Sequence, residues 1–261
     1  MATLQFELTF LYLALAFYSV FGIGVLFSKV RENNHNTLLL LAISGLILHS
    51  TSIAIRWIRI EHGPFINLYE ILTSNVWSLT IGITLFLYFF RRWGVIFYTL
   101  TPVIFIMMLW LITTSAKDTF LPPTYNTMWL YYHVISGKIF FTLLFLATGL
   151  AVHSLRSNPS KKAQAWKLAY KFLAAAFVAE SFMLLFGAIW AQDAWGRYWA
   201  WDPLETWAFL TWLAMIFTLH YQINFKRNRL FSWMIIGCFI MAFLTFYGVP
   251  FVSTAPHKGM I

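Results

Sequence analysis

The chain has 261 residues, of which 60% are hydrophobic, 20% aromatic and only 10% charged, and its formal net charge is +9. Soluble domains carry about a quarter charged residues. Apolar runs of about 20 residues recur along this chain, so its composition excludes a soluble globular protein and predicts an integral membrane protein. The positive charge does not indicate nucleic-acid binding, because basic residues in such chains follow the positive-inside rule. The single cysteine, Cys238, excludes an internal disulfide.

Hydropathy predicts about eight membrane-spanning helices, with no interval long enough for a separate soluble domain. The expected spans are roughly 6–28, 37–58, 71–90, 94–115, 129–153, 171–191, 204–224 and 230–249. The first apolar run lacks a basic stretch before it and a small-residue cleavage site after it, so we expect a retained span rather than a cleavable signal. The predicted fold class is all-α, a polytopic membrane helical bundle forming a single domain over residues 1–261.

The distribution of charge between the connections predicts the orientation of the spans. Twelve of the 18 basic residues fall on one side, namely Lys29, Arg31, Arg91, Arg92, Arg156, Lys161, Lys162, Lys167, Lys171, Lys226, Arg227 and Arg229. The other side holds Glu7, Glu61, Glu70, Asp118, Asp193, Asp202 and Glu205. Because basic loops stay on the inner side, we expect both termini and the segment 190–212 to face the outer compartment.

The outer connection HGPFINLYE, residues 62–70, combines Pro64 with a helix start expected near Asn67. Basic residues at the outer side run against the orientation rule, and these are Arg56, Arg59, Lys138 and Arg197. Such side chains either bind anionic partners, since the arginine fork matches a carboxylate, or pair with Glu61, Asp193 or Asp202. The sequence leaves both explanations open. Glu180, in the middle of the sixth expected span, must be either paired or protonated.

Residues 190–212, WAQDAWGRYWAWDPLETWAFLTW, hold six of the 13 tryptophans, at positions 190, 195, 199, 201, 207 and 212. An aromatic belt is spread over many helix ends, whereas this concentration favours a platform for a large planar ligand. We expect Asp202 to cap the following helix, with Pro203 at its first position and Glu205 at its third. Before it, a short interfacial helix or turn would place Trp195 and Trp199 on one face.

Histidines on the expected outer side are candidate ligands for a metal above this platform. His133 begins the fifth span and His257 follows the last, so together they could supply both axial ligands to an iron; singly, each could be an interfacial hydrogen-bonding residue. His220, within the seventh span, is either functional or turned to the inner interface. His49 lies about 10 Å away from it in depth, so we do not expect these two to share a metal.

The stretch WGRYWAWDPLETWAFLTWL resembles the WWD signature of haem-handling membrane proteins, in the form found in the CcsA/ResC branch of System II cytochrome c biogenesis. Three further stretches are similar to elements of that family: HGPFINLYEILTSNVW, YYHVISGK with an outer histidine, and the tail with a second outer histidine. Two features depart from the family. Ile66 stands where relatives usually have serine, and the chain is shorter than many of them.

The resemblance implies that haem b is both substrate and bound ligand, and that it is exported or presented on the outer face for covalent attachment to the CxxCH motif of apocytochrome c. It implies that His133 and His257 are axial ligands of the iron, and that His220 is a membrane-embedded ligand whose partner comes from a CcsB/ResB subunit. Haem contacts are implied for Trp195, Gly196, Arg197, Trp199, Trp201 and Asp202. The implied location is the bacterial plasma membrane, or the thylakoid membrane for a plastid-encoded chain.

On this resemblance we expect a subunit of a holocytochrome c synthase whose contribution is positioning rather than acid–base chemistry. The sequence lacks a phosphate-binding glycine loop, zinc-ligand spacing and a nucleophile motif, so hydrolysis is not predicted. Two alternatives stay open: a haem-binding chaperone without ligation activity, and a cytochrome b-like electron-transfer subunit that uses His49 and His220. No nucleic-acid partner is expected.

Overall fold

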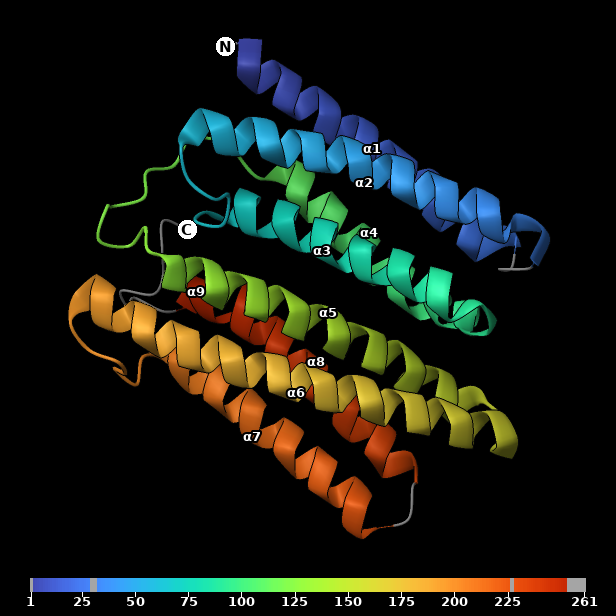
Figure 1. Ribbon diagram of the computed structural model, residues 1–261. Helices are drawn as coiled ribbons and strands as arrows, with labels where there is room; N and C mark the ends of the chain where they lie inside the picture. The colour runs from blue at the N-terminus through green and yellow to red at the C-terminus, as the bar shows by residue number, and fades with distance from the viewer. Residues whose placement is uncertain (1, 29–31, 226–227, 253–261) are drawn as a thin grey trace. The chain divides into compact units, whose positions relative to one another are not determined.

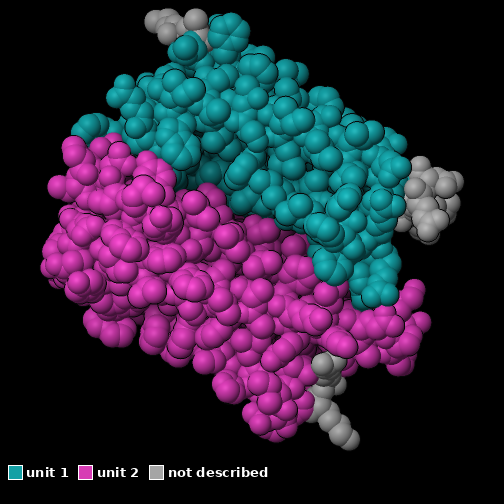
Figure 2. All heavy atoms as spheres, in the orientation of Figure 1, with its two compact units in different colours: residues 1–120 teal, residues 121–261 magenta. Residues whose placement is uncertain are grey.

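The computed structural model describes residues 2–28, 32–225 and 228–252, and within these ranges all regular structure is helical. This confirms the predicted all-α class. The helices gather into two compact units, unit 1 over residues 1–120 and unit 2 over residues 121–261 (Figure 2). The prediction of one functional domain over the whole chain stays a prediction.

Unit 1 is built from α1 (Ala2–Ser28), α2 (Glu32–Ile60), α3 (Leu68–Phe89), the short 3₁₀ helix η1 (Arg91–Ile96) and α4 (Phe97–Thr113). α1 packs along α2, α2 packs on α3, and α4 packs against both α1 and α3 (Figure 1). The Asn67 side chain accepts a hydrogen bond from Glu70 N and thereby caps α3, which confirms the helix start predicted for this element.

Unit 2 contains α5 (Met128–Arg156), α6 (Pro159–Trp195), α7 (Pro203–Asn224), α8 (Arg229–Tyr247) and the single turn α9 (Val249–Val252). α5 and α6 form a long antiparallel hairpin, while α8 packs against α5 and α7 (Figure 1). Large apolar side chains, including Phe141, Leu144 and Phe145 of α5 and Ile235 of α8, are buried between these helices. Their packing holds the end of α6 and the start of α7 in place.

α6 is much longer than the span predicted over 171–191, because the basic interval before it is helical rather than a loop. Asn158 accepts a hydrogen bond from Lys161 N, and Pro159 occupies the first helical position. The residues KKAQAWKLAYK that follow are mostly strong helix formers, and they bury Ala165, Trp166 and Ala169. A hydropathy window detects only the apolar part of such a helix, so the predicted start at 171 was wrong, while the predicted end at 191 lies one turn before Trp195.

Seven of the described helices are long and apolar enough to cross a membrane. The seventh predicted span, 204–224, coincides with α7, which has 22 residues but does not belong to that group. Its tryptophans, together with His220 and Gln222, lower its hydropathy. The chain is therefore a multi-pass membrane protein, and the orientation of its termini stays a prediction.

Candidate functional site

The segment that joins α6 to α7 turns at a glycine and ends at a side-chain cap. Gly196 closes α6 with a φ of 78°, in the left-handed region that favours glycine, and its N–H donates to Gln192 O. Asp202 then accepts a hydrogen bond from Glu205 N at 2.8 Å, so the predicted cap of α7 is confirmed. The Glu205 carboxylate accepts from Ala200 N, also at 2.8 Å. These two bonds fix the backbone on which Trp199 and Trp201 stand.

The expectation that Trp195 and Trp199 share one face was wrong. Trp195 is the last residue of α6, and Gly196 reverses the chain directly after it. The Trp195 ring contacts Trp190, with 5.0 Å between ring centroids, whereas the Trp199 ring lies 5.7 Å from that of Trp201. The signature therefore divides its tryptophans between two aromatic groups.

The first group, here called the histidine-side cluster, consists of Tyr125, His133, Trp190 and Trp195. The His133 ring stacks on Trp190, with an interplanar angle of 15°, and its Nδ1 donates to Met183 O at 2.8 Å. A neutral imidazole that donates from Nδ1 carries its lone pair on Nε2, the arrangement found in metal-binding histidines. Trp190 Nε1 donates to Tyr125 O at 2.9 Å and orients the stacking surface.

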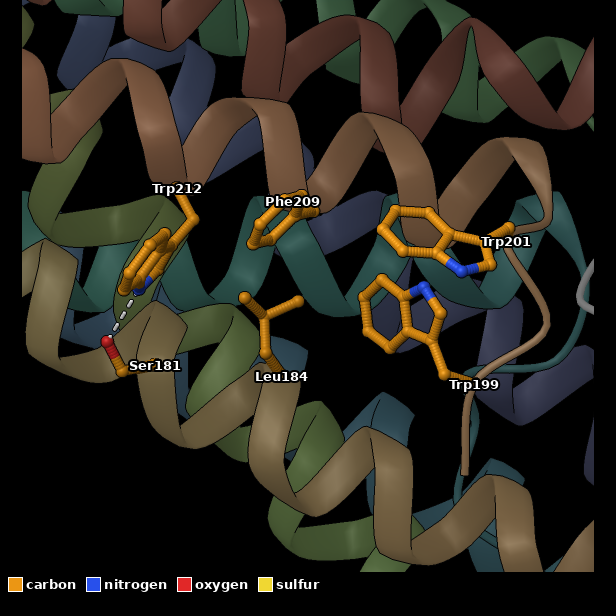
Figure 3. A pocket seen from close by; sticks show the side chains of 6 residues that line it. All are labelled: Ser181, Leu184, Trp199, Trp201, Phe209 and Trp212. Carbon is orange, nitrogen blue, oxygen red and sulfur yellow. Dashed lines mark hydrogen bonds between the residues drawn. The ribbon is translucent and has the colours of Figure 1, made fainter. Parts of the chain in front are cut away.

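The second group lines a groove of about 380 Å³, here called the tryptophan pocket. Figure 3 shows side chains from three segments meeting around it, and these are Ser181, Leu184, Trp199, Trp201, Phe209 and Trp212. Trp212 Nε1 donates to Ser181 Oγ at 2.8 Å, and the Phe209 and Trp212 rings stack with 6.0 Å between centroids. Trp201 is 67% exposed, and its ring meets that of Trp199 edge to face.

The two groups use different faces of α6. Ser181 and Leu184, which line the pocket, are three positions apart in the sequence and therefore lie on one face of the helix. Met183, Gly187 and Trp190 follow each other at spacings of four and three on the opposite face, where His133 packs. The structure thus brings His133 together with Trp190, and Trp199 together with Trp201, but His133 does not line the pocket.

The remaining predicted ligands are distributed over the chain. His220 is exposed near the end of α7, where its backbone oxygen accepts from Asn224. Arg197 is exposed beside the turn, and His257 lies outside the described residues. His49 is fully buried in unit 1, with its Nδ1 3.3 Å from the Tyr18 hydroxyl.

Sequence reasoning missed a buried ionic network in unit 1. Arg56, only 1% exposed, pairs with Glu7 at 3.0 Å and with Glu70 at 2.7 Å. Arg59 pairs with Glu7 at 2.6 Å and also with Asp118. Pairing thus explains these two arginines, but their partners are not the acids proposed from sequence. The sequence did contain one signal for this network: its three acids, Glu7, Glu70 and Asp118, were all predicted to lie on the outer side, as were the two arginines.

The same network ties the connection between α2 and α3 to the segment that follows α4. The second oxygen of Glu70 accepts from Ile66 N at 2.7 Å, and Thr119 Oγ1 donates to the first at 2.6 Å. The ring nitrogens of His62 lie 3.0 Å from Gly63 O and 3.1 Å from Thr119 O. The HGPFINLYE element therefore holds the segment that follows α4, and its polar atoms are used for structure.

The chain is similar to a known protein family over a region that contains most of this site. A sequence profile described as "Cytochrome C assembly protein" matches residues 65–257, which include α3 to α9 and both aromatic groups. The chain belongs to this family. A cytochrome c biogenesis protein CcsA of the cyanobacterium Prochlorococcus marinus is 28% identical, over 89% of this chain and 87% of that protein. CcsA of Guillardia theta is 25% identical, over 97% of this chain and 94% of that protein.

A solved structure shows the same fold. The cytochrome c haem lyase CcmF superposes with a TM-score of 0.75 at 16% identity, over 95% of this chain and 47% of that one. This chain thus spans about half the length of that protein. As a member of the cytochrome c assembly family, the chain is a multi-pass membrane protein of cytochrome c biogenesis, and the resemblance to the CcsA branch is confirmed.

Proposed function

We propose that this chain takes haem b as its substrate and bound ligand, and presents it on the outer face for covalent attachment to the CxxCH motif of apocytochrome c. It acts as the CcsA-type subunit of a System II cytochrome c synthase, together with a CcsB/ResB-type subunit. The observation that carries the proposal is the orientation of His133, which is stacked on Trp190 and donates from Nδ1 to Met183 O. We place the chain in the bacterial plasma membrane, or in the thylakoid membrane if it is plastid-encoded.

The residues present fit such a ligand. Indole faces suit a flat apolar macrocycle; Trp195 supplies one in the histidine-side cluster, and Trp199 and Trp201 supply others at the tryptophan pocket. Trp199 Nε1 is buried and has no hydrogen-bond partner among the described residues, so a polar ligand edge could accept from it. The Nε2 lone pair of His133 suits an iron.

Each proposed residue has a separate task. We assign the outer axial ligands to His133 and His257. The exposed Arg197 guanidinium is suited to a haem propionate, while Gly196 and Asp202 hold the turn that presents the tryptophans. His220, on an exposed face of α7, is suited to a haem whose second ligand comes from the CcsB/ResB subunit.

Positioning supplies most of the catalysis in this proposal. Haem, when bound, provides two vinyl groups, and each thiol S–H of the CxxCH motif adds across one of them. The chain's own residues orient the ring and exclude water, and a fixed near-attack geometry can lower the barrier by about 7–11 kcal/mol. Acid–base residues are not required at the aromatic surface.

The decisive experiment replaces His133 by glycine in the full chain, co-expressed with a CcsB/ResB partner and a reporter apocytochrome c. We expect covalent haem in the reporter to be lost and partly restored by free imidazole, which can occupy the space of the missing ring. His257→Gly should behave in the same way. His153→Gly is the matched control, because His153 lies at the far end of α5 and bonds to Ser157.

Wild-type maturation in both variants would overturn the assignment of these ligands. The same reconstitution separates the alternatives. A haem chaperone without ligation activity retains haem but leaves the reporter unmodified. A cytochrome b-like subunit would need His49 and His220 for a fixed haem, and would not depend on His133.

A further inference from the structure

One end of unit 2 gathers basic side chains from three helices. α5 ends at Arg156, α6 begins at Pro159 and α8 begins at Arg229. Ser232 Oγ lies 2.7 Å from Ser154 Oγ and accepts from Trp166 Nε1 at 2.7 Å, so these three helix ends are tied together. We call this group the basic end; its members are Arg156, Lys161, Lys162, Lys167, Lys171 and Arg229.

The basic end has no internal counter-charge. No acidic residue occurs between positions 121 and 179 or after Glu205. Glu180 is buried within α6, and the other acids of unit 2 lie at the opposite end of that helix, around Asp193 and Asp202. In the ranges that the structure describes, the ion pairs all belong to unit 1. Among the described residues of unit 2, these six cations thus stand together without an anion.

The four lysines of the basic end all lie on α6, which is longer than a helix needs to be to cross a membrane. Its 37 residues span about 55 Å, whereas the hydrocarbon core is about 30 Å thick. Lys167 and Lys171 are exposed on the face opposite the buried Ala165 and Ala169. Lys162 Nζ lies 5.7 Å from the Trp166 ring, a pairing of cation and indole that suits the headgroup region.

We propose that the basic end binds the phosphate headgroups of anionic phospholipids in the leaflet that surrounds it. Lysine stems can lie along apolar surface while their ammonium groups reach the phosphates. Each basic residue near an anionic surface strengthens attraction about fivefold, and the effect fades within a Debye length. The bound lipids hold the α5–α6 hairpin at a defined depth, and with it the aromatic groups at the far end of α6.

The test uses the full chain purified in a neutral detergent, with retained lipid counted by native mass spectrometry. We expect phosphatidylglycerol to be retained at least tenfold better than phosphatidylcholine, and this preference to fall with added salt. Replacing Lys161, Lys162, Lys167 and Lys171 by glutamine should abolish the preference, because about fivefold per residue amounts to about 600-fold for four residues. The matched variant with arginine at the same four positions should keep it.

Three outcomes would overturn the proposal: equal retention of both lipids, an unchanged preference in the glutamine variant, and displacement of the lipid by millimolar inorganic phosphate, which would indicate a small-anion site. If the fourfold glutamine variant does not insert, K167Q/K171Q carries the test, because both side chains are exposed. The preference should then fall by up to about 25-fold, about fivefold for each residue. The readout does not involve cytochrome c maturation, so its failure is independent of the proposed function.

Discussion

The two units differ in the hydrogen bonding of the buried polar side chains in and near their family motifs, HGPFINLYE in unit 1 and the tryptophan-rich segment 190–212 in unit 2. In unit 1, the buried Glu7 and Glu70 pair with Arg56, Glu7 pairs also with Arg59, and backbone groups take up the remaining bonds of Arg56 and Glu70. In unit 2, the described residues provide no partner for Trp199 Nε1 or for the buried Glu180 carboxyl. Since an unsatisfied buried polar group is costly, we infer that the ionic network of unit 1 serves its own fold, whereas Trp199 in unit 2 is available for a ligand.

The largest effect on folding is expected from removing Arg56, the centre of the unit 1 network. Arg56→Met leaves the buried Glu70 carboxylate without its counter-ion and leaves Glu7 with Arg59 alone, which costs about 3–5 kcal/mol. The free energy of unfolding, from denaturant titration in detergent, should fall by that amount. Arg59→Met is the control and should cost less, because Asp118 is 66% exposed and can be solvated. An equal loss in both variants would show that the network does not stabilise unit 1 through burial.

A methyl group at Gly187 tests whether the orientation of His133 matters in unit 2. An added Cβ would lie 2.6 Å from His133 Nδ1, so Gly187→Ala must displace the ring from Met183 O. Overpacking of this kind costs about 1–3 kcal/mol. We expect cytochrome c maturation to fall sharply, because the ring can no longer present Nε2 in its fixed direction.

Gly237→Ala in α8 is the matched control for that substitution. An added Cβ there meets nothing within 4 Å, and alanine is the better helix former by up to about 1 kcal/mol. Its free energy of unfolding should be unchanged or higher, with maturation at the wild-type level. If Gly187→Ala also matures the reporter normally, the Nδ1 bond of His133 is not needed for function.

Some of these features could be predicted from the sequence because they depend on local chemistry. Hydropathy located all eight long helices, and the order Asp202, Pro203, Glu205 specified a cap that the structure shows. The partners of Arg56 could not be predicted in the same way. Glu7 lies 49 residues from Arg56 and meets it only through the packing of α1 on α2.

The division of the tryptophans between two aromatic groups could not be predicted from the sequence either. It depends on the left-handed residue Gly196, which ends α6 at Trp195 and sends Trp199 to another face. A glycine in a polar interval indicates a turn, but not the direction in which the chain leaves it. For the same reason the pocket lining from α6, Ser181 and Leu184, was not foreseen.

A smaller effect is expected from the cap of α7. Asp202→Ala removes the acceptor for Glu205 N, at a cost of about 1 kcal/mol in free energy of unfolding. Asn158→Ala removes the equivalent cap of α6 and should cost about the same. The two should differ in maturation, because only Asp202 holds the turn that carries Trp199 and Trp201. Equal maturation in both variants would show that the turn needs no such support.

The smallest change in stability is expected from replacing residues with left-handed backbone by glycine. Among its described residues, each unit contains one such residue other than glycine: Glu61 in unit 1, with φ 61°, and Trp201 in unit 2, with φ 58°. Such a conformation costs about 1–2 kcal/mol outside glycine. Glu61→Gly should therefore raise the free energy of unfolding slightly. In Trp201→Gly the same relief is offset by lost ring contacts with Trp199 and Phe209, so the net change stays below about 1 kcal/mol.

Maturation of the reporter cytochrome c distinguishes the two substitutions. Glu61→Gly should leave maturation unchanged, because in unit 1 the conformation only turns the chain toward the paired network. Trp201→Gly should reduce it strongly, because it removes the exposed indole that lines the tryptophan pocket. If Trp201→Gly matures the reporter normally while Glu61→Gly does not, the assignment of structure to unit 1 and of ligand binding to unit 2 is reversed.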